Sequence, residues 1–248
     1  MEIRSKVALI TGASSGIGAA TARMLAAEGV KVGLAARRTE RLEEIKNEII
    51  AIGGEAITIQ MDVTDMNSVQ EGTNKLVQAY GTVDFLINNA GVMYLSEVEN
   101  LRIDEWQLMV DINIKGVLNA TAAVLPLMTR QHSGHIVNIS SYAGKKLAKG
   151  LSVYSATKFA VSAFTEGLRM ELGPKYHIRT TVIQPGAVKT ELFDLIRDEQ
   201  FKQEILNSRS GVSFMTPEQL ADTILFALKA PEKVNIAELF AVPVDEAW

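Results

Sequence analysis

Seven short runs of mostly apolar and β-branched residues alternate with helical patterns, and this alternation constrains the fold more than any other feature. The expected strands are residues 7–11, 30–35, 56–60, 83–88, 135–140, 178–183 and 236–242. Between them, apolar residues recur near the helical period, which predicts helices at 16–28, 40–52, 68–80, 104–131, 154–172 and 217–228. Strands that alternate with helices form parallel βαβ units. The prediction is an α/β fold with a doubly wound, seven-stranded parallel sheet and helices on both faces.

Composition narrows the class of protein. With 248 residues, 47% of them apolar, and no linker-like or repeated segment, the chain is expected to form a single domain over residues 1–248. A net charge of -4 with scattered basic residues argues against nucleic acid as a partner. The absence of cysteine excludes thiol chemistry and fits a cytoplasmic protein. No apolar run looks long enough for a membrane span, so we expect no membrane partner.

The first expected strand runs directly into a glycine-rich turn that opens the first helix, Thr11-Gly12-Ala13-Ser14-Ser15-Gly16-Ile17-Gly18. Ligands of doubly wound sheets bind beyond the carboxyl ends of the strands, where this turn lies. Glycines there let backbone N–H groups approach a pyrophosphate at a helix N-terminus. The spacing differs from the G-x-G-x-x-G fingerprint, so two interpretations stay open: a nucleotide site, or glycines that only permit tight packing.

The second strand is followed by Ala36-Arg37-Arg38, at the point where folds that bind NAD carry an acid for the ribose hydroxyls. Two guanidinium groups can instead bind a 2′-phosphate through charge-assisted hydrogen bonds, so the pair favours NADP(H) over NAD(H). The alternative is that Arg37 and Arg38 only begin the charged helix face that continues through Glu40 and Arg41.

Tyr154 and Lys158 lie four residues apart on an expected helix. Residues at this spacing project from the same face, so an ammonium group stands beside a phenol. A neighbouring cation favours the phenolate, which lowers the pKa of a phenol and makes it a better acid or base near neutral pH. Tyr154 is therefore a candidate general acid/base, although the same spacing also occurs in ordinary surface pairs.

Together these motifs resemble the short-chain dehydrogenase/reductase family in its shorter, single-domain branch, and the resemblance covers essentially the whole chain. It implies a Rossmann-type fold with strand order 3-2-1-4-5-6-7 and a nicotinamide cofactor. The residues assigned to that cofactor, from the resemblance or from the reasoning above, are Gly12, Ser14, Ser15, Gly16, Ile17, Gly18, Arg37, Arg38, Asp62, Val63, Asn89, Ala90, Gly91, Tyr154, Lys158, Pro185, Gly186, Val188 and Thr190.

The catalytic residues of the family are matched by Asn113, Ser141, Tyr154 and Lys158. Ser140 and Ser141 point to opposite faces of an extended strand end, and the family's spacing to the tyrosine selects Ser141. The resemblance implies hydride transfer between a nicotinamide and a carbonyl or alcohol. In this hypothesis Ser141 and Tyr154 hydrogen-bond the carbonyl oxygen, and Tyr154 delivers the proton. Lys158 lowers the pKa of the phenol and hydrogen-bonds the nicotinamide ribose. Asn113 anchors a water that links Lys158 to solvent.

Histidine chemistry finds little support in the sequence. A hydrolytic triad would need a histidine near a nucleophile. His132, His135 and His177 are expected in loops at the end of the sheet opposite the cofactor. Since His132 and His135 have no matched ligands nearby, no metal site is expected.

The resemblance also outlines a substrate region. It includes the loop 143–153 and the segment 190–215, here called the lid. Its alternating charged and apolar residues are typical either of an amphipathic lid or of a simple exposed helix. The apolar residues expected either around the substrate or in the core are Met93, Leu95, Leu147, Leu151, Leu192 and Phe193. Lys145, Lys146 and Lys149 either attract a carboxylate-bearing substrate such as a 3-oxo acid or form a solvated charge run.

The expectation is therefore a cytoplasmic, NADP(H)-dependent carbonyl reductase or alcohol dehydrogenase for a small-molecule ketone, aldehyde or 3-oxo acid. The arginine pair and residues 237–243 resemble the subgroup that acts on 3-hydroxy acids and clavulanate-type aldehydes. The resemblance implies a homotetramer assembled through the long helices that carry Asn113 and Tyr154. The alternative is a non-catalytic NADP(H)-binding sensor or scaffold on the same fold.

Overall fold

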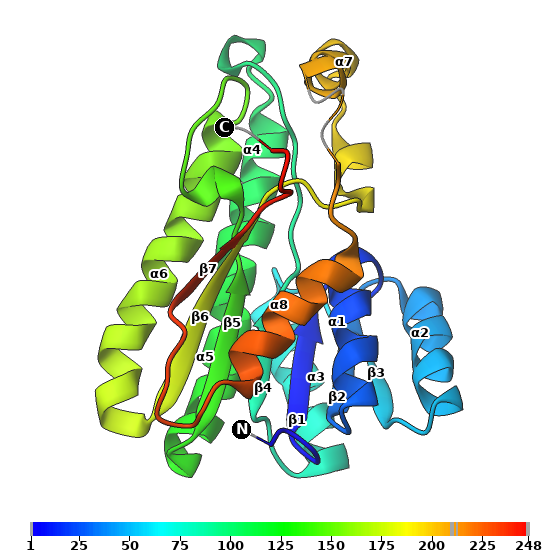
Figure 1. Ribbon diagram of the computed structural model, residues 1–248, viewed down its shortest axis with the longest axis vertical. Helices are drawn as coiled ribbons and strands as arrows, with labels where there is room; N and C mark the ends of the chain where they lie inside the picture. The colour runs from blue at the N-terminus through cyan, green and yellow to red at the C-terminus, as the bar shows by residue number, and fades with distance from the viewer. Residues whose placement is uncertain (1, 209–210, 212, 247–248) are drawn as a thin grey trace.

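The computed structural model describes residues 2–208, 211 and 213–246. Its seven strands form one parallel sheet in the order β3-β2-β1-β4-β5-β6-β7, so the predicted α/β class and strand order are confirmed (Figure 1). The strands are β1 (Val7–Thr11), β2 (Lys31–Ala36), β3 (Ala56–Gln60), β4 (Phe85–Asn88), β5 (Gly134–Ile139), β6 (Ile178–Pro185) and β7 (Glu238–Ala241).

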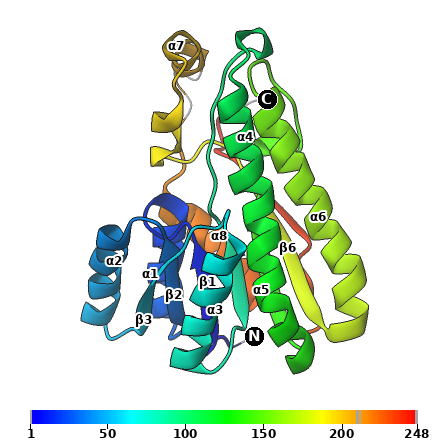
Figure 2. The ribbon, with the colours of Figure 1, turned by 180° about the vertical axis from the view of Figure 1, so that it is seen from behind.

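Helices cover both faces of the sheet (Figures 1 and 2). One face carries α1 (Gly16–Ala27), α2 (Thr39–Ala51) and α8 (Pro217–Lys229). The other face, toward the viewer in Figure 2, carries α3 (Met66–Tyr80), α4 (Ile103–Val110), α5 (Gly116–Gln131) and α6 (Ser152–Tyr176). Because all seven strands are parallel, the loops that follow them meet at one edge of the sheet, where a site is expected.

The side chains of β1 show why its sequence is continuously apolar. Ala8 and Ile10 pack into the core beneath α1, α2 and α8, whereas Val7 and Leu9 pack beneath α3, α5 and α6. All four are essentially inaccessible to solvent. Because helices cover both faces, neither side of the central strand can be polar.

The long helix predicted at 104–131 is interrupted. A π-helical turn at Asp111–Lys115 separates α4 from α5, and it contains Asn113. A π turn adds one residue to a helical repeat and occurs often at functional sites. A period-based prediction cannot detect it, because the helical path continues on both sides.

The stretch Ile103–Gln131 is long and apolar enough to cross a membrane by length and composition, so the expectation that no run reaches this length is wrong. In the fold it lies against the sheet, with Ala120, Val124 and Met128 buried. Core helices pass the same test, and 44% of its most apolar window is buried.

After β6 the chain leaves the sheet, forms the lid and returns to α8. Val188 and Met215 pair as an isolated parallel bridge at the base of this excursion. The lid contains a short 3-10 helix, η4 (Glu191–Leu195), and α7 (Glu199–Ser208). Figure 1 shows α7, in gold, beyond the carboxyl ends of the strands.

Candidate active site

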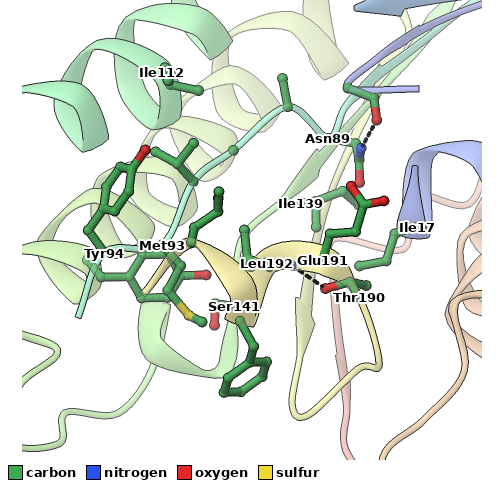
Figure 3. A pocket seen from close by; sticks show the side chains of 18 of the residues that line it. Ile17, Asn89, Met93, Tyr94, Ile112, Ile139, Ser141, Thr190, Glu191 and Leu192 are labelled. Atoms are coloured by element: carbon green, nitrogen blue, oxygen red, sulfur yellow. Dashed lines mark hydrogen bonds between the residues drawn. The ribbon is translucent and has the colours of Figure 1, made fainter. Parts of the chain in front are cut away.

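One large cavity, of about 840 Å³, opens at the carboxyl ends of the strands. Every residue assigned from the sequence to the cofactor or to catalysis lines it, except Gly18 and Asn113. Figure 3 shows two sides: Ile17, Asn89 and Thr190 on one, and Met93 with Tyr94 on the other.

We call the first the glycine-turn side. It is lined by Gly12, Ser14–Ile17, Arg37, Arg38, Asp62, Val63 and Asn89–Gly91. The second is the lid side. It is lined by Met93–Leu95, Leu108, Ile112, Ala148, Lys149, Leu151, Leu192, Phe193, Leu195, Phe201, Glu204 and Ile205.

The glycines of the first turn are required by close approach of the backbone. Gly12 has φ +65°, and a Cβ there would lie 2.8 Å from Ala90 Cα. A Cβ on Gly18 would lie 2.5 Å from both Asn89 Nδ2 and Gly12 O. Gly18 therefore serves packing, while Gly12 and Gly16 line the cavity. The turn thus combines a glycine required by packing with glycines that line the cavity.

Thr11 and Asn89 lock this turn to the loop after β4. The Thr11 hydroxyl accepts hydrogen bonds from the backbone N–H groups of Asn89 and Ala90, both at 3.1 Å. The Asn89 amide donates to the carbonyl oxygens of Thr11 and Gly12, also at 3.1 Å. The sequence analysis missed both roles, although a threonine at a strand end beside a glycine turn is a usable signal.

The two arginines after β2 have different surroundings. The Arg38 guanidinium donates to the Ser14 hydroxyl at 3.1 and 3.2 Å and to the Ser15 hydroxyl at 2.8 Å. Arg37 lies near Asp62. Burial raises the pKa of Asp62, but hydrogen bonds from Thr64 and the charge of Arg37 outweigh this and hold that pKa below its ordinary value. The guanidinium groups therefore belong to the cavity wall and do not only continue the face of α2.

Tyr154 and Lys158 lie in the first turns of α6 and are both buried. Lys158 Nζ lies 5.7 Å from the centroid of the Tyr154 ring and donates to the carbonyl oxygen of Ile139 at 3.0 Å. Burial lowers the pKa of Lys158 from 10.5 to about 8. At pH 7 the side chain is still an ammonium group, so the cation required beside the phenol is present.

The adjacent serines separate as their strand geometry requires. Ser140 is buried, and its hydroxyl donates to the carbonyl oxygen of Lys158 at 2.8 Å. Ser141 is less buried, and its hydroxyl accepts a hydrogen bond from the N–H of Ala143 at 3.1 Å. This bond does not use the Ser141 hydroxyl proton, and Ser141 lines the cavity, as Tyr154 does.

Asn113 lies behind the cavity wall. Its amide pairs with both backbone groups of Val92, accepting from N–H at 2.8 Å and donating to C=O at 2.9 Å. It also donates to the Thr157 hydroxyl at 3.1 Å. Asn113 thus ties the loop after β4 to α6, one residue before Lys158.

The lid side is predominantly apolar. Met93, Leu95 and Phe201 are buried there, and Tyr94, Trp106, Leu192 and Phe193 pack against them. Sequence reasoning missed Tyr94 and Trp106, because aromatic residues in a loop and on an amphipathic helix give no distinct signal. Leu147 is a correction: it is 75% exposed and does not line the cavity, because it lies in an exposed loop.

The three lysines before Tyr154 are engaged by other groups. Lys149 pairs with Glu97 at 2.7 Å, and Lys145 pairs with Glu238. Lys146 lies 5.9 Å from the centroid of the Tyr142 ring. This arrangement favours a solvated charge run over a cluster that faces a substrate.

One histidine differs from its expected loop position. His135 lies within β5, is fully buried, and its Nε2 lies 2.7 Å from the Thr181 hydroxyl. Burial lowers its pKa well below the ordinary value, so the ring is neutral. His132 and His177 end α5 and α6 in left-handed conformation. Among the described residues, no cluster of side chains could hold a metal ion.

Known proteins resemble this chain in sequence and in structure. Residues 6–200 match the model of the short chain dehydrogenase family. The chain is 45% identical over 251 residues, covering 100% of both chains, to an uncharacterized oxidoreductase of Listeria innocua.

Two solved structures extend the comparison. An alcohol dehydrogenase from the archaeon Thermococcus sibiricus, complexed with 5-hydroxy-NADP, is 31% identical, with a TM-score of 0.87 and 98% of each chain covered. A closed form of serine dehydrogenase, complexed with NADP+, is 32% identical, with a TM-score of 0.89 and coverage of 98% of this chain and 96% of that one. The protein is therefore an oxidoreductase of the short-chain dehydrogenase/reductase family.

Proposed function

We propose that the protein transfers a hydride between NADP(H) and a carbonyl or secondary alcohol substrate with an apolar flank. One observation carries the proposal: Ser141, Tyr154 and Lys158 line the same cavity as Arg37 and Arg38. The acid/base group and the predicted phosphate-binding groups thus share one site.

The residues of the glycine-turn side fit a dinucleotide. The backbone at Gly12 and the N-terminus of α1 are open to the cavity, which suits a pyrophosphate. Ser14, Ser15, Arg37 and Arg38 would hold a 2′-phosphate, and Asp62 with Val63 would contact the adenine. The segment from Pro185 to Thr190 would hold the nicotinamide end.

Each catalytic residue then has a defined role. When bound, the cofactor supplies or accepts a hydride at C4 of its nicotinamide. The Tyr154 hydroxyl donates its proton to the carbonyl oxygen, and the Ser141 hydroxyl donates a hydrogen bond to the same oxygen. Lys158 stabilises the phenolate that remains. Asn113 positions α6 and, as the family resemblance implies, holds a water that connects Lys158 to solvent.

The test is a panel of ketones, aldehydes and 3-oxo acids, followed by nicotinamide absorbance with both cofactors. We expect NADPH consumption with at least one apolar carbonyl compound. Tyr154→Phe is expected to lower kcat/KM by about 10³-fold while NADPH still binds. Tight NADPH binding with no turnover on any compound would instead favour the non-catalytic sensor or scaffold.

Cofactor preference has its own test. Arg37→Ala is expected to raise the KM for NADPH far more than that for NADH, because only NADPH carries the 2′-phosphate. Equal increases for both cofactors would contradict a phosphate-binding role for Arg37. The 2′-phosphate assignment is supported by the NADP-type ligands of the two structural relatives.

The lid side supports an uncharged, apolar flank on the substrate. The cation that lines this side is Lys149, which is exposed and paired with Glu97. Serine dehydrogenase, by its name, acts on a 3-hydroxy amino acid, so 3-oxo acids stay within the substrate panel. Clavulanate-type aldehydes stay there for the same reason of resemblance.

Assembly, partners and location complete the proposal. We expect a cytoplasmic homotetramer whose partner is a small molecule and which binds neither nucleic acid nor membrane. Leu118 on α5 and Phe159 and Met170 on α6 are 40%, 41% and 64% exposed, which supports contacts between copies through these helices. Light scattering coupled to size-exclusion chromatography tests this, and Met170→Glu is expected to shift the distribution toward smaller species.

A further inference from the structure

An ion pair joins the phosphate-binding arginine to the lid. Arg38 Nη1 lies 3.0 Å from Glu191 Oε2, although the two residues are 153 positions apart in the chain. The same guanidinium bonds the hydroxyls of Ser14 and Ser15. Glu191 also lines the cavity, so the carboxylate lies where the 2′-phosphate is proposed to bind.

Local structure fixes Glu191 in this place. A Cβ on Gly16 would lie 3.1 Å from Thr190 Cγ2, so Thr190 packs against the glycine turn. The Thr190 hydroxyl accepts from the N–H of Leu192 at 3.3 Å and starts η4. Glu191 is the first residue of that helix, and Figure 3 shows it beside Thr190 and Ile17.

The contact places a negative charge beside Arg38. The chain has no acid directly after β2, where Ala36-Arg37-Arg38 stands. The lid therefore supplies a carboxylate that the second strand lacks. Hydrogen bonds from Arg38 and Ser15 lower the pKa of Glu191, so it is ionised at neutral pH. Both side chains are half exposed, so nucleotide can exchange with this pair.

We infer that Glu191 is a specificity-determining residue that competes with the 2′-phosphate of the cofactor for Arg38. This inference rests on the proposed function. A nucleotide with a 2′-phosphate must displace the carboxylate or bind beside its charge. A nucleotide without that phosphate leaves the ion pair intact. Glu191 thus moderates the preference for NADP(H) that the arginine pair creates.

A binding experiment without turnover tests this inference. Adenosine 2′,5′-bisphosphate, NADPH and NADH are titrated calorimetrically into the wild-type chain and into Glu191→Gln at low ionic strength. We expect Glu191→Gln to bind the two 2′-phosphorylated ligands about fivefold more tightly, the scale of one screened charge–charge contact. The affinity for NADH should change less than twofold. The gain in affinity for the 2′-phosphorylated ligands should shrink in 0.5 M salt, because the Debye length falls there to roughly a few ångströms.

Two variants show whether the effect runs through Arg38. Asp194→Asn removes an exposed negative charge from the same helix and should leave all three affinities within twofold of wild type. In an Arg38→Ala background, Glu191→Gln should no longer tighten binding of NADPH. A tightening that persists in that background, or one that also applies to NADH, would overturn the competition. Weaker NADPH binding in Glu191→Gln would do so as well.

The outcomes separate this inference from the proposed function. If the wild-type chain binds and oxidises NADPH but Glu191→Gln does not selectively tighten the binding of the 2′-phosphorylated ligands, only the inference fails. If the predicted binding pattern is found but no carbonyl compound is reduced, only the proposed reaction fails. If none of the three ligands binds the wild-type chain, both fail.

Discussion

The glycine-turn side and the lid side of the cavity are built in different ways. The first is defined by backbone: glycines without room for a Cβ, and hydrogen bonds of Thr11 and Asn89 that fix two loops against each other. The second is defined by side chains such as Met93, on the loop after β4, and Phe201, on a chain excursion that is closed at its base by one bridge.

Because of this difference, the two sides should tolerate substitutions to different extents. A backbone cradle accepts almost no substitution, because any added atom meets main chain. An apolar wall can change its shape through one side chain while the fold persists. We therefore expect substitutions on the glycine-turn side and at the acid/base centre to alter stability and turnover, and those on the lid side to alter substrate affinity.

The largest effect is expected at the centre where both sides meet. Lys158→Met should lower turnover by about 10³-fold, because the phenolate loses its cation. The same change should stabilise the ligand-free fold at pH 7. A pKa of about 8 instead of 10.5 means that the buried ammonium costs about 3 kcal/mol. The variant also loses the hydrogen bond to Ile139 O, which offsets about 1 kcal/mol of this gain in stability.

The stability of the fold should depend on pH through Lys158. Between about pH 8 and 10.5 the unfolded chain holds the lysine proton and the folded chain does not, so wild-type stability rises with pH in this window. Urea unfolding should show the advantage of Lys158→Met at pH 7 and its loss near pH 10. The exposed Lys233→Met is the control and should show neither effect.

Gly18→Ala tests the packing of the glycine-turn side. The new Cβ would lie 2.5 Å from Asn89 Nδ2 and Gly12 O, so we expect a loss of about 2–3 kcal/mol in the free energy of unfolding and weaker nucleotide binding. Gly167→Ala in α6 is the matched control, since a Cβ there meets no atom within 4 Å. That variant should gain about 1 kcal/mol from helix propensity. Equal stability of the two variants would break the argument for a steric cradle.

Phe201→Ala tests the lid side. Phe201 is 7% exposed and fills the space beside Gly150, where any Cβ would meet its ring. We expect the KM for an apolar substrate to rise about tenfold, the scale of one lost hydrophobic contact, with the Kd for NADPH unchanged. Leu206→Ala on the same helix removes a side chain that is 43% exposed and should change neither constant. A matching loss of NADPH affinity in Phe201→Ala would show that the two sides are not independent.

The smallest effect is expected at Lys149. Its partner Glu97 and its high exposure indicate a solvated charge, so Lys149→Gln should alter kcat/KM less than twofold. The measurement compares a 3-oxo acid with its neutral methyl ester. A selective loss for the acid would reveal a carboxylate-binding group on the lid side.

The sheet could be predicted because each strand carries its own local signal. β1 and β3 have the predicted bounds, and both faces of β1 are apolar as its position requires. The π turn at Asp111–Lys115 could not be predicted, because nothing in the local pattern marks the extra residue. The strand expected at 135–140 includes His135, but the burial of its side chain could not be predicted, because it depends on a partner, Thr181, from the next strand.

The candidate site followed from motifs where one segment supplies the group, as with Tyr154 and Lys158. It did not follow where two distant segments meet. The bond between Glu191 and Arg38 and the contacts of Asn89 with Thr11 depend on the folded chain. Leu147 was assigned to the pocket as an apolar residue of the loop that the resemblance places at the substrate, and neither criterion distinguishes a pocket wall from an exposed loop.

The hydrogen bonds between Thr11 and residues 89 and 90 have a consequence for how the chain folds. They span 78 and 79 positions, so the first β-α-β unit carries every glycine of the turn yet lacks the partners that shape it. Nucleotide affinity should consequently emerge late during refolding, only after β4 has entered the sheet beside β1. The ability to bind is, in this chain, a property of long-range assembly and not of its most recognisable motif.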